Sequence, residues 1–360
     1  MRRLNRRYLA YLILIAALAV AFILWRLCFP PALYRVTILP SLDGQPMVAL
    51  SLNDRGQVAG LGSTPLGDGR LFLWDRENGI QDLGPMIYGS VTINNSGQIS
   101  GNVRLDPNHY EAFLWKPGEG RTGLETPGDG SSLAIAMNNR GQIVGYSRGN
   151  ATGGSGFLWD EARGMTQLQI PDGPDCQAMS INDAGQILMM PLGRPPGSRR
   201  WFLLDPNGPI PLDTLPPNAR PYSINSQGCI VAIENPGHAR PYVLVSNRQG
   251  EWKRLFDFAG GLEPTRMNDR QQVAYTEYTH SRWDDLEDRL FGPRLPIDRV
   301  ASYLWNPVRG RIPLNRYLHG LDRFIVRDLN NEGAIIGTAV TRDGRTCSVL
   351  LEPIDKRWDE

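Results

Sequence analysis

Residues that build most catalytic and metal sites are scarce in this sequence. Its 360 residues include four histidines and four cysteines, with no Cys-x-x-Cys pair and no His-Glu-x-x-His motif. The histidines stand at unrelated places, namely His109, His238, His280 and His319. The sequence therefore predicts no catalytic residues, no metal site and no cofactor.

The sequence also lacks an excess of charge of either sign. The 38 Lys and Arg residues against 37 Asp and Glu residues leave a net charge of +1. A near-neutral chain does not attract a polyanion, so we expect no nucleic-acid partner. The acidic residues fall mostly in expected turns, and their spacing selects no pair of carboxylates for glycoside hydrolysis.

The amino terminus carries a long apolar run. Residues 8–25 contain no charged side chain, and four arginines precede them: Arg2, Arg3, Arg6 and Arg7. Eighteen helical residues span about 27 Å, close to the ~30 Å hydrocarbon core of a bilayer. Because basic residues stay in the cytoplasm, residues 1–30 are expected to form a cytoplasmic end and a single transmembrane signal anchor in the inner membrane, with the remainder in the periplasm or extracellular space. A cleaved signal peptide is the alternative, but residues 24–28 offer no Ala-x-Ala-like cleavage site.

A short pattern, Asn-x-x-Gly between two apolar runs, is repeated along the chain. In the copy over residues 136–145, Asn138 begins the turn and Gly141 ends it. Asn can hydrogen-bond the backbone two residues on, and Gly adopts positive φ without a Cβ penalty, so the pattern predicts a β-hairpin. Only the sixth copy lacks the glycine and has Gln271 instead. The turn asparagines are Asn53, Asn94, Asn138, Asn182, Asn225, Asn268 and Asn330.

The spacing of these hairpins predicts a β-propeller. Successive turn asparagines are 41, 44, 44, 43, 43 and 62 residues apart. After each hairpin come a third apolar strand, such as Phe113-Leu114-Trp115, and, in all copies but the last, a turn with Gly and a short fourth strand. Four strands in about 43 residues is the size of a propeller blade. We therefore predict an all-β, seven-bladed, monomeric β-propeller over residues 34–353, followed by a charged tail, 354–360.

The ends of the repeat region predict how the ring closes. The seventh copy has three strands and reaches Glu352-Pro353 without a fourth. Residues 34–39 can supply it, since Leu39 precedes Asn53 by the fourteen residues that separate Leu124 from Asn138. An amino-terminal strand in the last blade would leave no open seam between the two ends.

These repeats resemble a known family. Ile-Asn-x-x-Gly-Gln-Ile-x-Gly followed by Ala-Phe-Leu-Trp, as in Glu111-Ala112-Phe113-Leu114-Trp115, is similar to the HAF repeat of extracellular bacterial proteins, named after His-Ala-Phe. None of the copies here keeps the His. The resemblance covers roughly residues 34–353 and is clearest in the first three repeats. It implies export and repetition, and it supplies no catalytic residues.

The most regular features are expected to be structural. The Phe and Trp of the third strand stand where the sheets of neighbouring blades pack, so we expect them in the core. Glycines seven residues after the turn Asn indicate close strand packing or bulges and lack a phosphate-loop pattern: Gly60, Gly101, Gly145 and Gly337. The exported cysteines, Cys176, Cys229 and Cys347, occupy non-equivalent places in the repeat and are expected to be buried thiols rather than a disulfide framework.

The first departure from the repeat is an insertion. The distance from Asn268 to the aromatic Tyr303 is 35 residues, against about 19 in most copies, and the extra chain falls within residues 276–301. Its sequence predicts a short amphipathic helix that begins after Ser281. One interpretation is a tolerated surface insertion; the other is a lid or partner-binding loop that uses His280, Trp283, Asp284 and Asp285.

The second departure lies two residues before the turn Asn. Five blades have a small residue there, whereas blade six has Arg266 and blade seven Asp328. We expect these opposite charges to lie close together near the axis, as an inter-blade ion pair or as part of a polar channel site.

The predicted function is therefore binding or scaffolding in the cell envelope, with a protein or a glycan as partner. The alternative is a propeller hydrolase or lyase that acts on envelope or extracellular polysaccharide. Carboxylates that converge in the channel mouth would favour the enzyme, whereas an exposed apolar patch on the insertion would favour the binding protein.

Overall fold

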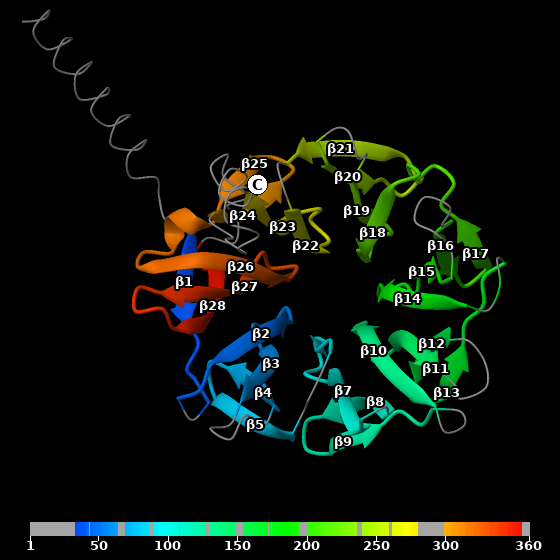
Figure 1. Ribbon diagram of the computed structural model, residues 1–360, viewed down its shortest axis with the longest axis horizontal. Coiled ribbons are helices and arrows are strands. Elements are labelled where there is room, and N and C mark those ends of the chain that lie inside the picture. Colours follow the sequence, from blue (N-terminus) through cyan, green and yellow to red (C-terminus); the bar gives the residue numbers. More distant parts are fainter. Residues whose placement is uncertain are drawn as a thin grey trace, which may run out of the picture.

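A computed structural model describes the propeller region, and Figure 1 shows its blades arranged around a central axis. The described residues are 33–354, except for 43, 64–68, 86–88, 108, 127–129, 149–153, 172, 174, 194–199, 236–239, 259–260 and 280–298.

Seven four-stranded antiparallel sheets form the blades. Blades one to four consist of β2 (Met47–Leu52), β3 (Val58–Ser63), β4 (Gly69–Asp75) and β5 (Gly79–Pro85); β6 (Thr92–Ile93), β7 (Ile99–Asp106), β8 (His109–Lys116) and β9 (Gly120–Gly123); β10 (Ser131–Met137), β11 (Ile143–Arg148), β12 (Gly154–Asp160) and β13 (Gly164–Gln167); β14 (Cys176–Ile181), β15 (Ile187–Pro191), β16 (Phe202–Asp205) and β17 (Gly208–Pro211). Blades five to seven consist of β18 (Ala219–Ile224), β19 (Ile230–Glu234), β20 (Tyr242–Ser246) and β21 (Trp252–Asp257); β22 (Gly261–Met267), β23 (Val273–Thr279), β24 (Arg299–Asn306) and β25 (Gly310–Pro313); β26 (Leu321–Leu329), β27 (Ile335–Thr341), β28 (Thr346–Pro353) and β1 (Tyr34–Ile38). A 3-10 turn over Asn315–Tyr317 precedes β26. The predicted all-β, seven-bladed propeller is confirmed.

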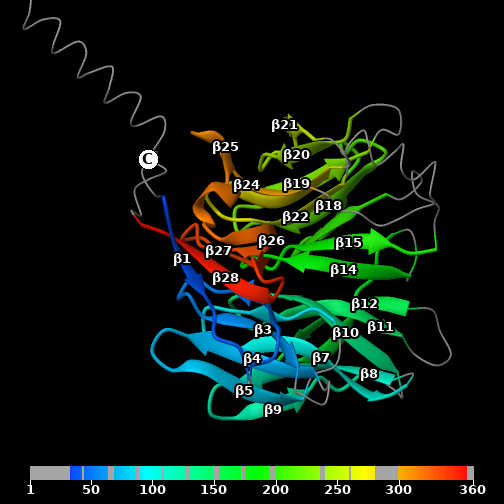
Figure 2. The same cartoon turned by 60° about the vertical axis from the view of Figure 1, so that its left-hand side comes forward.

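The amino-terminal strand closes the ring, as the repeat arithmetic predicts. β1 pairs antiparallel with β28, from Tyr34 opposite Pro353 to Ile38 opposite Val349. Figure 2 shows the two strands side by side at the edge of the last blade. Tyr34 is buried and packs edge-on against Tyr317, with 5.5 Å between ring centroids. The seam is therefore held by core packing as well as by strand pairing.

The turn asparagines have a local role in their own hairpins. Asn138 Oδ1 accepts hydrogen bonds from the N–H groups of Arg140 (3.1 Å) and Gln142 (3.0 Å). Gly141 ends the turn with φ of 74°. In the sixth hairpin Gln271 adopts φ of 58°, so the same backbone is kept without glycine. This conformation costs a residue with Cβ about 1–2 kcal/mol, as expected from the sequence.

The same asparagines also join neighbouring blades. The Nδ2 group of each donates to the backbone carbonyl oxygen of the turn Asn in the next blade, at 2.9 to 3.5 Å. The last of these bonds runs from Asn330 to Asn53 and completes a circle of seven. We call this circle the asparagine ring. The sequence interpretation had assigned these residues to their turns alone.

The hydrophobic core is divided among the interfaces between blades. One cluster, for example, joins Leu71 and Leu73 of blade one to Ile93, Ile99 and Phe113 of blade two. The third-strand phenylalanines are almost completely buried, at 0 to 1 % exposure: Phe72, Phe113, Phe157 and Phe202. The expected place of the phenylalanines in the core is confirmed. Of the tryptophans, Trp74 is buried, whereas Trp115, Trp159 and Trp305 are half-buried.

A β-bulge interrupts the first strand of most blades. In blade one the register shifts between Ala49 and Ser51, and Leu50 is the extra residue. A Cβ on Gly60, opposite Ala49, would lie 2.2 Å from the carbonyl oxygen of Val48, so only glycine allows this close approach. In blade three a Cβ on Gly145 would meet the Leu133 carbonyl oxygen at 1.9 Å. Close packing and bulges thus explain these glycines.

The connection between β23 and β24 falls within residues 276–301, as the sequence predicts. β23 continues to Thr279 and β24 begins at Arg299, because the two strands pair along their full length. Thr276 and Ser302 belong to the core, where their hydroxyl oxygens are 3.0 Å apart and Thr276 Oγ1 accepts the Val326 N–H at 2.9 Å. The pattern alone does not show where the two strands end, so it predicts only the outer bounds of the insertion.

Several predictions concern residues that the structure does not describe. The transmembrane anchor at 8–25 and the loop residues His280, Trp283, Asp284 and Asp285 lie outside the described residues. Within the described part of the chain, no helix has the length and hydropathy needed to cross a membrane.

The closing strand yields the first testable prediction. Tyr34→Ala should lower the free energy of unfolding by about 3 kcal/mol, since it removes a buried aromatic ring from the seam. Arg35→Ala, one position along on the exposed side of the strand, should change it by less than about 0.5 kcal/mol. Urea unfolding followed by tryptophan fluorescence measures both, and equal effects would contradict closure through β1.

The asparagine ring yields the second testable prediction. Asn138→Asp keeps both acceptor bonds but loses the donor to the carbonyl oxygen of Asn182 (3.0 Å) and to Gln142 Oε1 (2.8 Å). We expect destabilisation by about 2–4 kcal/mol at neutral pH, because a buried carboxylate would face two acceptor oxygens. The loss should shrink at low pH, where protonation returns a donor. Asn207→Asp, in an exposed turn, is the control and should stay within about 0.5 kcal/mol at both pH values.

Candidate functional site in the central channel

The bulges direct side chains into the channel. A bulge places two consecutive residues of one strand opposite a single partner, which re-aims their side chains. The extra residue lies three positions before the turn Asn, as with Ile135, Met179 and Tyr222. These side chains line a cavity of about 700 Å³ on the face where the first strands begin. We call it the wide cavity; its volume is in the range of about 300–1,000 Å³ typical of ligand sites.

The wall of the wide cavity has two unlike parts. Blades one to five contribute an apolar crescent, which consists of Leu50, Val91, Ile135, Met179 and Tyr222, and polar side chains of the same blades, such as Ser90 and Gln177, lie beside it. Blades six and seven contribute the charged side chains among its described lining residues: Arg266, Arg327 and Asp328. Because these two blades lie across the ring from blades two to four, the cavity presents the apolar crescent on one side and a net positive charge on the other.

Arg266 and Asp328 lie together, as the sequence predicts. Arg266 Nε is 3.8 Å from Asp328 Oδ1, with the arginine side chain 42 % exposed and the aspartate 6 %. A contact this long, with one partner half-exposed, contributes little stability. The hydrogen bonds of Asp328 are shorter: Oδ2 accepts from Leu52 N–H at 2.9 Å and Ser51 Oγ at 3.2 Å.

A repeated contact explains why Asp328 is needed. In other blades a serine at this position accepts the N–H of the residue before the next turn Asn, as Ser51 does for Ile93 (3.1 Å) and Ser223 for Met267 (3.1 Å). Asp328 Oδ2 does the same for Leu52. Arg266 has no acceptor atom, and the corresponding N–H of Leu329 is bound by Asp328 Oδ1 at 2.9 Å. Asp328 therefore completes the inter-blade contacts on both of its sides.

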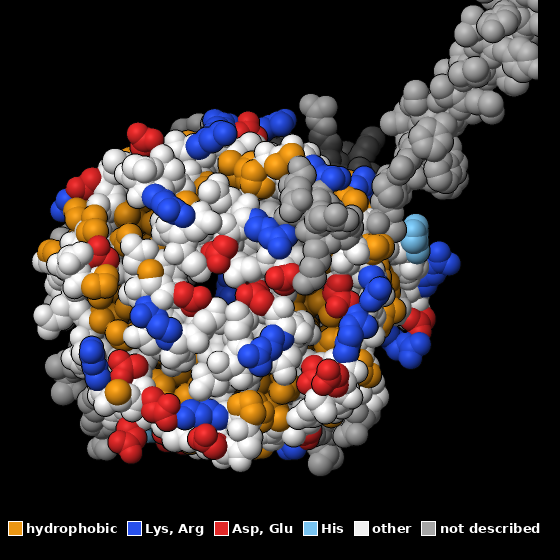
Figure 3. Space-filling view, turned by 180° about the vertical axis from the view of Figure 1, so that it is seen from behind, with side chains coloured by type: hydrophobic (Ala, Val, Ile, Leu, Met, Phe, Trp, Pro, Cys, Tyr) orange, Lys and Arg blue, Asp and Glu red, His pale blue; other side chains and the backbone are white. Residues whose placement is uncertain are grey.

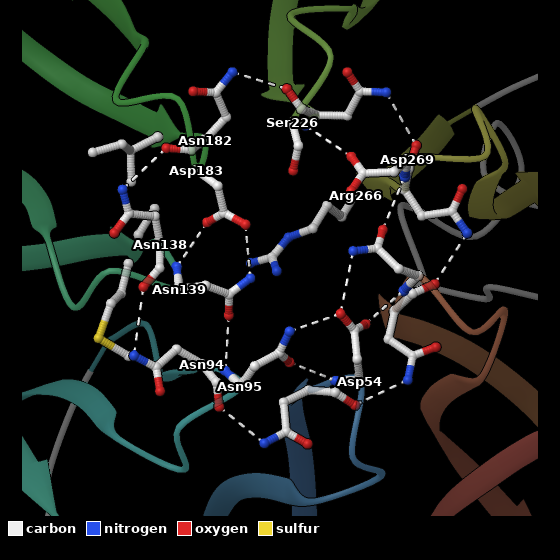
Figure 4. Close-up of a pocket in the computed structure, with 18 of the residues that line it drawn as sticks. Asp54, Asn94, Asn95, Asn138, Asn139, Asn182, Asp183, Ser226, Arg266 and Asp269 are labelled. Atoms are coloured by element: carbon white, nitrogen blue, oxygen red, sulfur yellow. Dashed lines mark hydrogen bonds between the residues drawn. The ribbon is translucent and has the colours of Figure 1, made fainter.

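The opposite end of the channel is narrow and is enclosed by the hairpin tips. The residues that follow the turn asparagines connect the hairpin tips. In six neighbouring pairs of blades, the side chain of this residue accepts a hydrogen bond from the backbone N–H of the same residue in the preceding blade, at 2.8 to 2.9 Å. Figure 4 shows these side chains around the opening, with Arg266 extending among them. Figure 3, which views the molecule from behind, shows acidic side chains around a small central opening. The cavity at this mouth is about 90 Å³, large enough for a few water molecules.

Three aspartates stand at this narrow mouth: Asp54, Asp183 and Asp269. Asp54 accepts hydrogen bonds from the N–H of Asn331 (2.8 Å) and from Asn95 Nδ2 (2.8 Å). Asp183 binds the N–H and the Nδ2 of Asn139, both at 2.8 Å, and Asp269 binds the N–H of Ser226 at 2.8 Å. Asparagine fills the same acceptor role in other blades. These carboxylates thus have a structural role between blades.

Other motifs in the described chain do not form a reactive site. Residues 145–149 read Gly-Tyr-Ser-Arg-Gly, the spacing of a nucleophile elbow, which requires a strand-to-helix turn. Ser147 lies instead within β11, is buried, and donates to the carbonyl oxygen of Ser155 at 3.4 Å. In the described part of the chain no group of three His, Cys, Asp or Glu side chains could hold a metal ion.

The described cysteines match the thiol prediction. Cys176 and Cys229 are buried, Cys347 is half-buried, and all three are free thiols. Burial raises the pKa of each thiol above its ordinary value, which keeps the reactive thiolate form scarce at neutral pH.

Sequence reasoning identified part of this site. It named Arg266 and Asp328, which the structure brings together, but missed Arg327 and the apolar crescent. The sequence signal that could have revealed the crescent is the position three residues before the turn Asn. Bulky residues stand there in most copies, in strands whose side chains otherwise alternate between the two faces of the sheet.

The Arg266–Asp328 contact yields the third prediction. Asp328→Ala should lower the free energy of unfolding by about 2–4 kcal/mol, because it leaves the buried N–H groups of Leu52 and Leu329 without their acceptor. Arg266→Ser should change it by less than about 1 kcal/mol, since the ion pair is loose and half-exposed. Urea unfolding of both variants measures the two changes. Equal losses of unfolding free energy would mean that the ion pair, and not the backbone contacts, holds these blades together.

Comparisons with known proteins agree on the fold. No protein-family model matches the chain, and no curated protein sequence matches it. Among solved structures it is similar to the acylaminoacyl peptidase of Pyrococcus horikoshii (TM-score 0.58, 11 % identity, 87 % of this chain and 53 % of that one) and to a puromycin hydrolase (TM-score 0.55, 12 % identity, 85 % and 52 %). It is also similar to the WD40 β-propeller domain of Doa1 (TM-score 0.51, 12 % identity, 91 % and 100 %). The chain spans about half the length of the two hydrolases, and at these identities the likeness establishes a β-propeller fold.

Proposed function

We propose that this protein is a binding module of the cell envelope, and that the wide cavity of its channel is where the partner enters. Residues 8–25 would anchor it in the inner membrane and leave the propeller, as a monomer, in the periplasm or extracellular space. The partner would be an envelope protein or a glycan. The four arginines before the apolar run support this orientation.

The wide cavity is the observation that carries the proposal. It is built from side chains that the bulges turn toward the axis, and it departs from the repeat in blades six and seven. Regular repeat positions serve the scaffold, whereas Arg266 and Arg327 have no counterpart in the other described blades. The resemblance to HAF repeats, which we propose as the family of this chain, supports export.

The insertion provides a second surface for the same partner. β23 ends and β24 begins on the face where the wide cavity opens, because both lie at the end of the blade where the first strand starts. We propose that His280, Trp283, Asp284 and Asp285 extend the binding surface there.

A hydrolase or lyase acting on polysaccharide is the second candidate, favoured by the aspartates at the narrow mouth. Their hydrogen bonds to backbone N–H groups favour the structural reading, so the binding module is preferred. Release of reducing ends from envelope polysaccharide by the purified protein, lost in Asp183→Asn, would reverse this preference.

The fourth prediction tests the binding site. Full-length protein in detergent, immobilised and exposed to solubilised envelope, should retain a saturable partner, and Ile135→Trp should weaken retention by narrowing the wide cavity. Ile210→Trp is the matched control, since Ile210 is 46 % exposed on an outer strand, and it should retain the partner. Replacement of residues 280–298 by a short turn should weaken retention. Retention that is unaffected by Ile135→Trp in a folded protein would overturn the channel as binding site.

A further inference from the structure

The chemistry of the wide cavity indicates what enters it. We propose that the channel binds an acidic, apolar segment of a protein partner, with a carboxylate held by Arg266 and Arg327 and an apolar side chain against the apolar crescent. This inference rests on the proposed binding function and adds the class of ligand.

The charge balance favours an anion. Two guanidinium groups and one carboxylate are the charged groups among the described side chains that line the cavity. Asp328 is already engaged by three donors, from Ser51, Leu52 and Leu329, which lessens its attraction for Arg266. The Arg266 side chain remains 42 % exposed, lines both the wide cavity and the narrow mouth (Figure 4), and carries planar donors suited to a carboxylate.

The framework does not require an arginine at position 266. Serine at the equivalent position in other blades accepts the N–H of the next blade, and such a serine would serve here equally well. With Arg266 in place, the N–H of Leu329 depends on Asp328 instead. The chain thus carries a guanidinium in the channel together with a residue that compensates for it, which points to a role in ligand recognition.

The opposite wall favours a peptide over a sugar. Four of the five side chains of the apolar crescent are aliphatic or Met, and Tyr222 is the aromatic member, 40 % exposed. Leu- or Phe-like side chains gain by leaving water against the crescent, whereas sugar hydroxyls would lose hydrogen bonds to water there and could regain them only at the polar groups beside it, such as Ser90 and Gln177. A carboxylate can come from a chain end or from an Asp or Glu side chain, and both sources fit the same wall.

Calorimetry on the full-length protein in detergent tests this with defined probes. N-acetyl-Leu-Phe, with a free chain end, and N-acetyl-Glu-Leu-Phe-amide, with only a side-chain carboxylate, represent the two sources. At least one should bind about tenfold or more tightly than N-acetyl-Leu-Phe-amide, which lacks the charge. Preference between the two acids identifies the source.

Variants connect binding to the named residues. Arg266→Gln and Arg327→Gln should each weaken the better acid about tenfold and leave the amide unchanged, whereas Arg163→Gln, in an exposed outer turn, should change neither. Tyr222→Ser should weaken the acid and the amide alike.

Three results would overturn the inference. They are equal affinity for acid and amide, binding of glucuronate as tight as that of the better peptide, and no binding of either acid by folded protein at about 10 mM. If retention of the envelope partner still depends on Ile135 in that case, the ligand class is wrong and the binding function stands. Loss of both overturns the binding function as well.

Discussion

Each turn asparagine uses its amide twice, once inside its own hairpin and once to reach the next blade. The Oδ1 atom shapes the turn, and the Nδ2 atom binds a carbonyl oxygen of the neighbour. Aspartate or serine could shape the turn but has no amide donor, so the inter-blade bond accounts for asparagine in all seven copies. Because every blade is held to the next at the same level of the axis, the first strands share one register. That common register brings equivalent residues of different blades to the same depth in the channel.

Most of the fold was accessible from the sequence because it depends on short-range patterns. The Asn-x-x-Gly turns, their spacing of about 43 residues and the fourteen-residue offset of Leu39 predict seven blades and the closing strand correctly. Inter-blade hydrogen bonds were missed, since a side chain that satisfies its own turn gives no sign of a second partner. Only outer bounds of the insertion could be predicted, for a similar reason: β23 and β24 extend because they pair with each other, and Thr276 is held by a different blade.

Only part of the channel site could be predicted from the sequence. Arg266 and Asp328 departed from small residues at one repeat position, which a comparison of the copies reveals. Leu50, Ile135, Met179 and Arg327 face the channel because a bulge breaks the alternation of the strand, and strict alternation would turn them elsewhere. The glycine opposite the bulge is its trace in the sequence, yet blades four to six lack even that.

The closing strand has a consequence for the order of folding. β1 pairs with β28, so its partner is synthesised only after the strands of all the other blades. Early blades can form hairpins as they appear, but the last sheet, its core and the final bond from Asn330 to Asn53 must wait. Pairing over so long a loop is slow, because the chain loses its freedom before the contact is gained. During that interval β1 is an unpaired strand, and the cell has to keep it from pairing with other chains until the circle is complete.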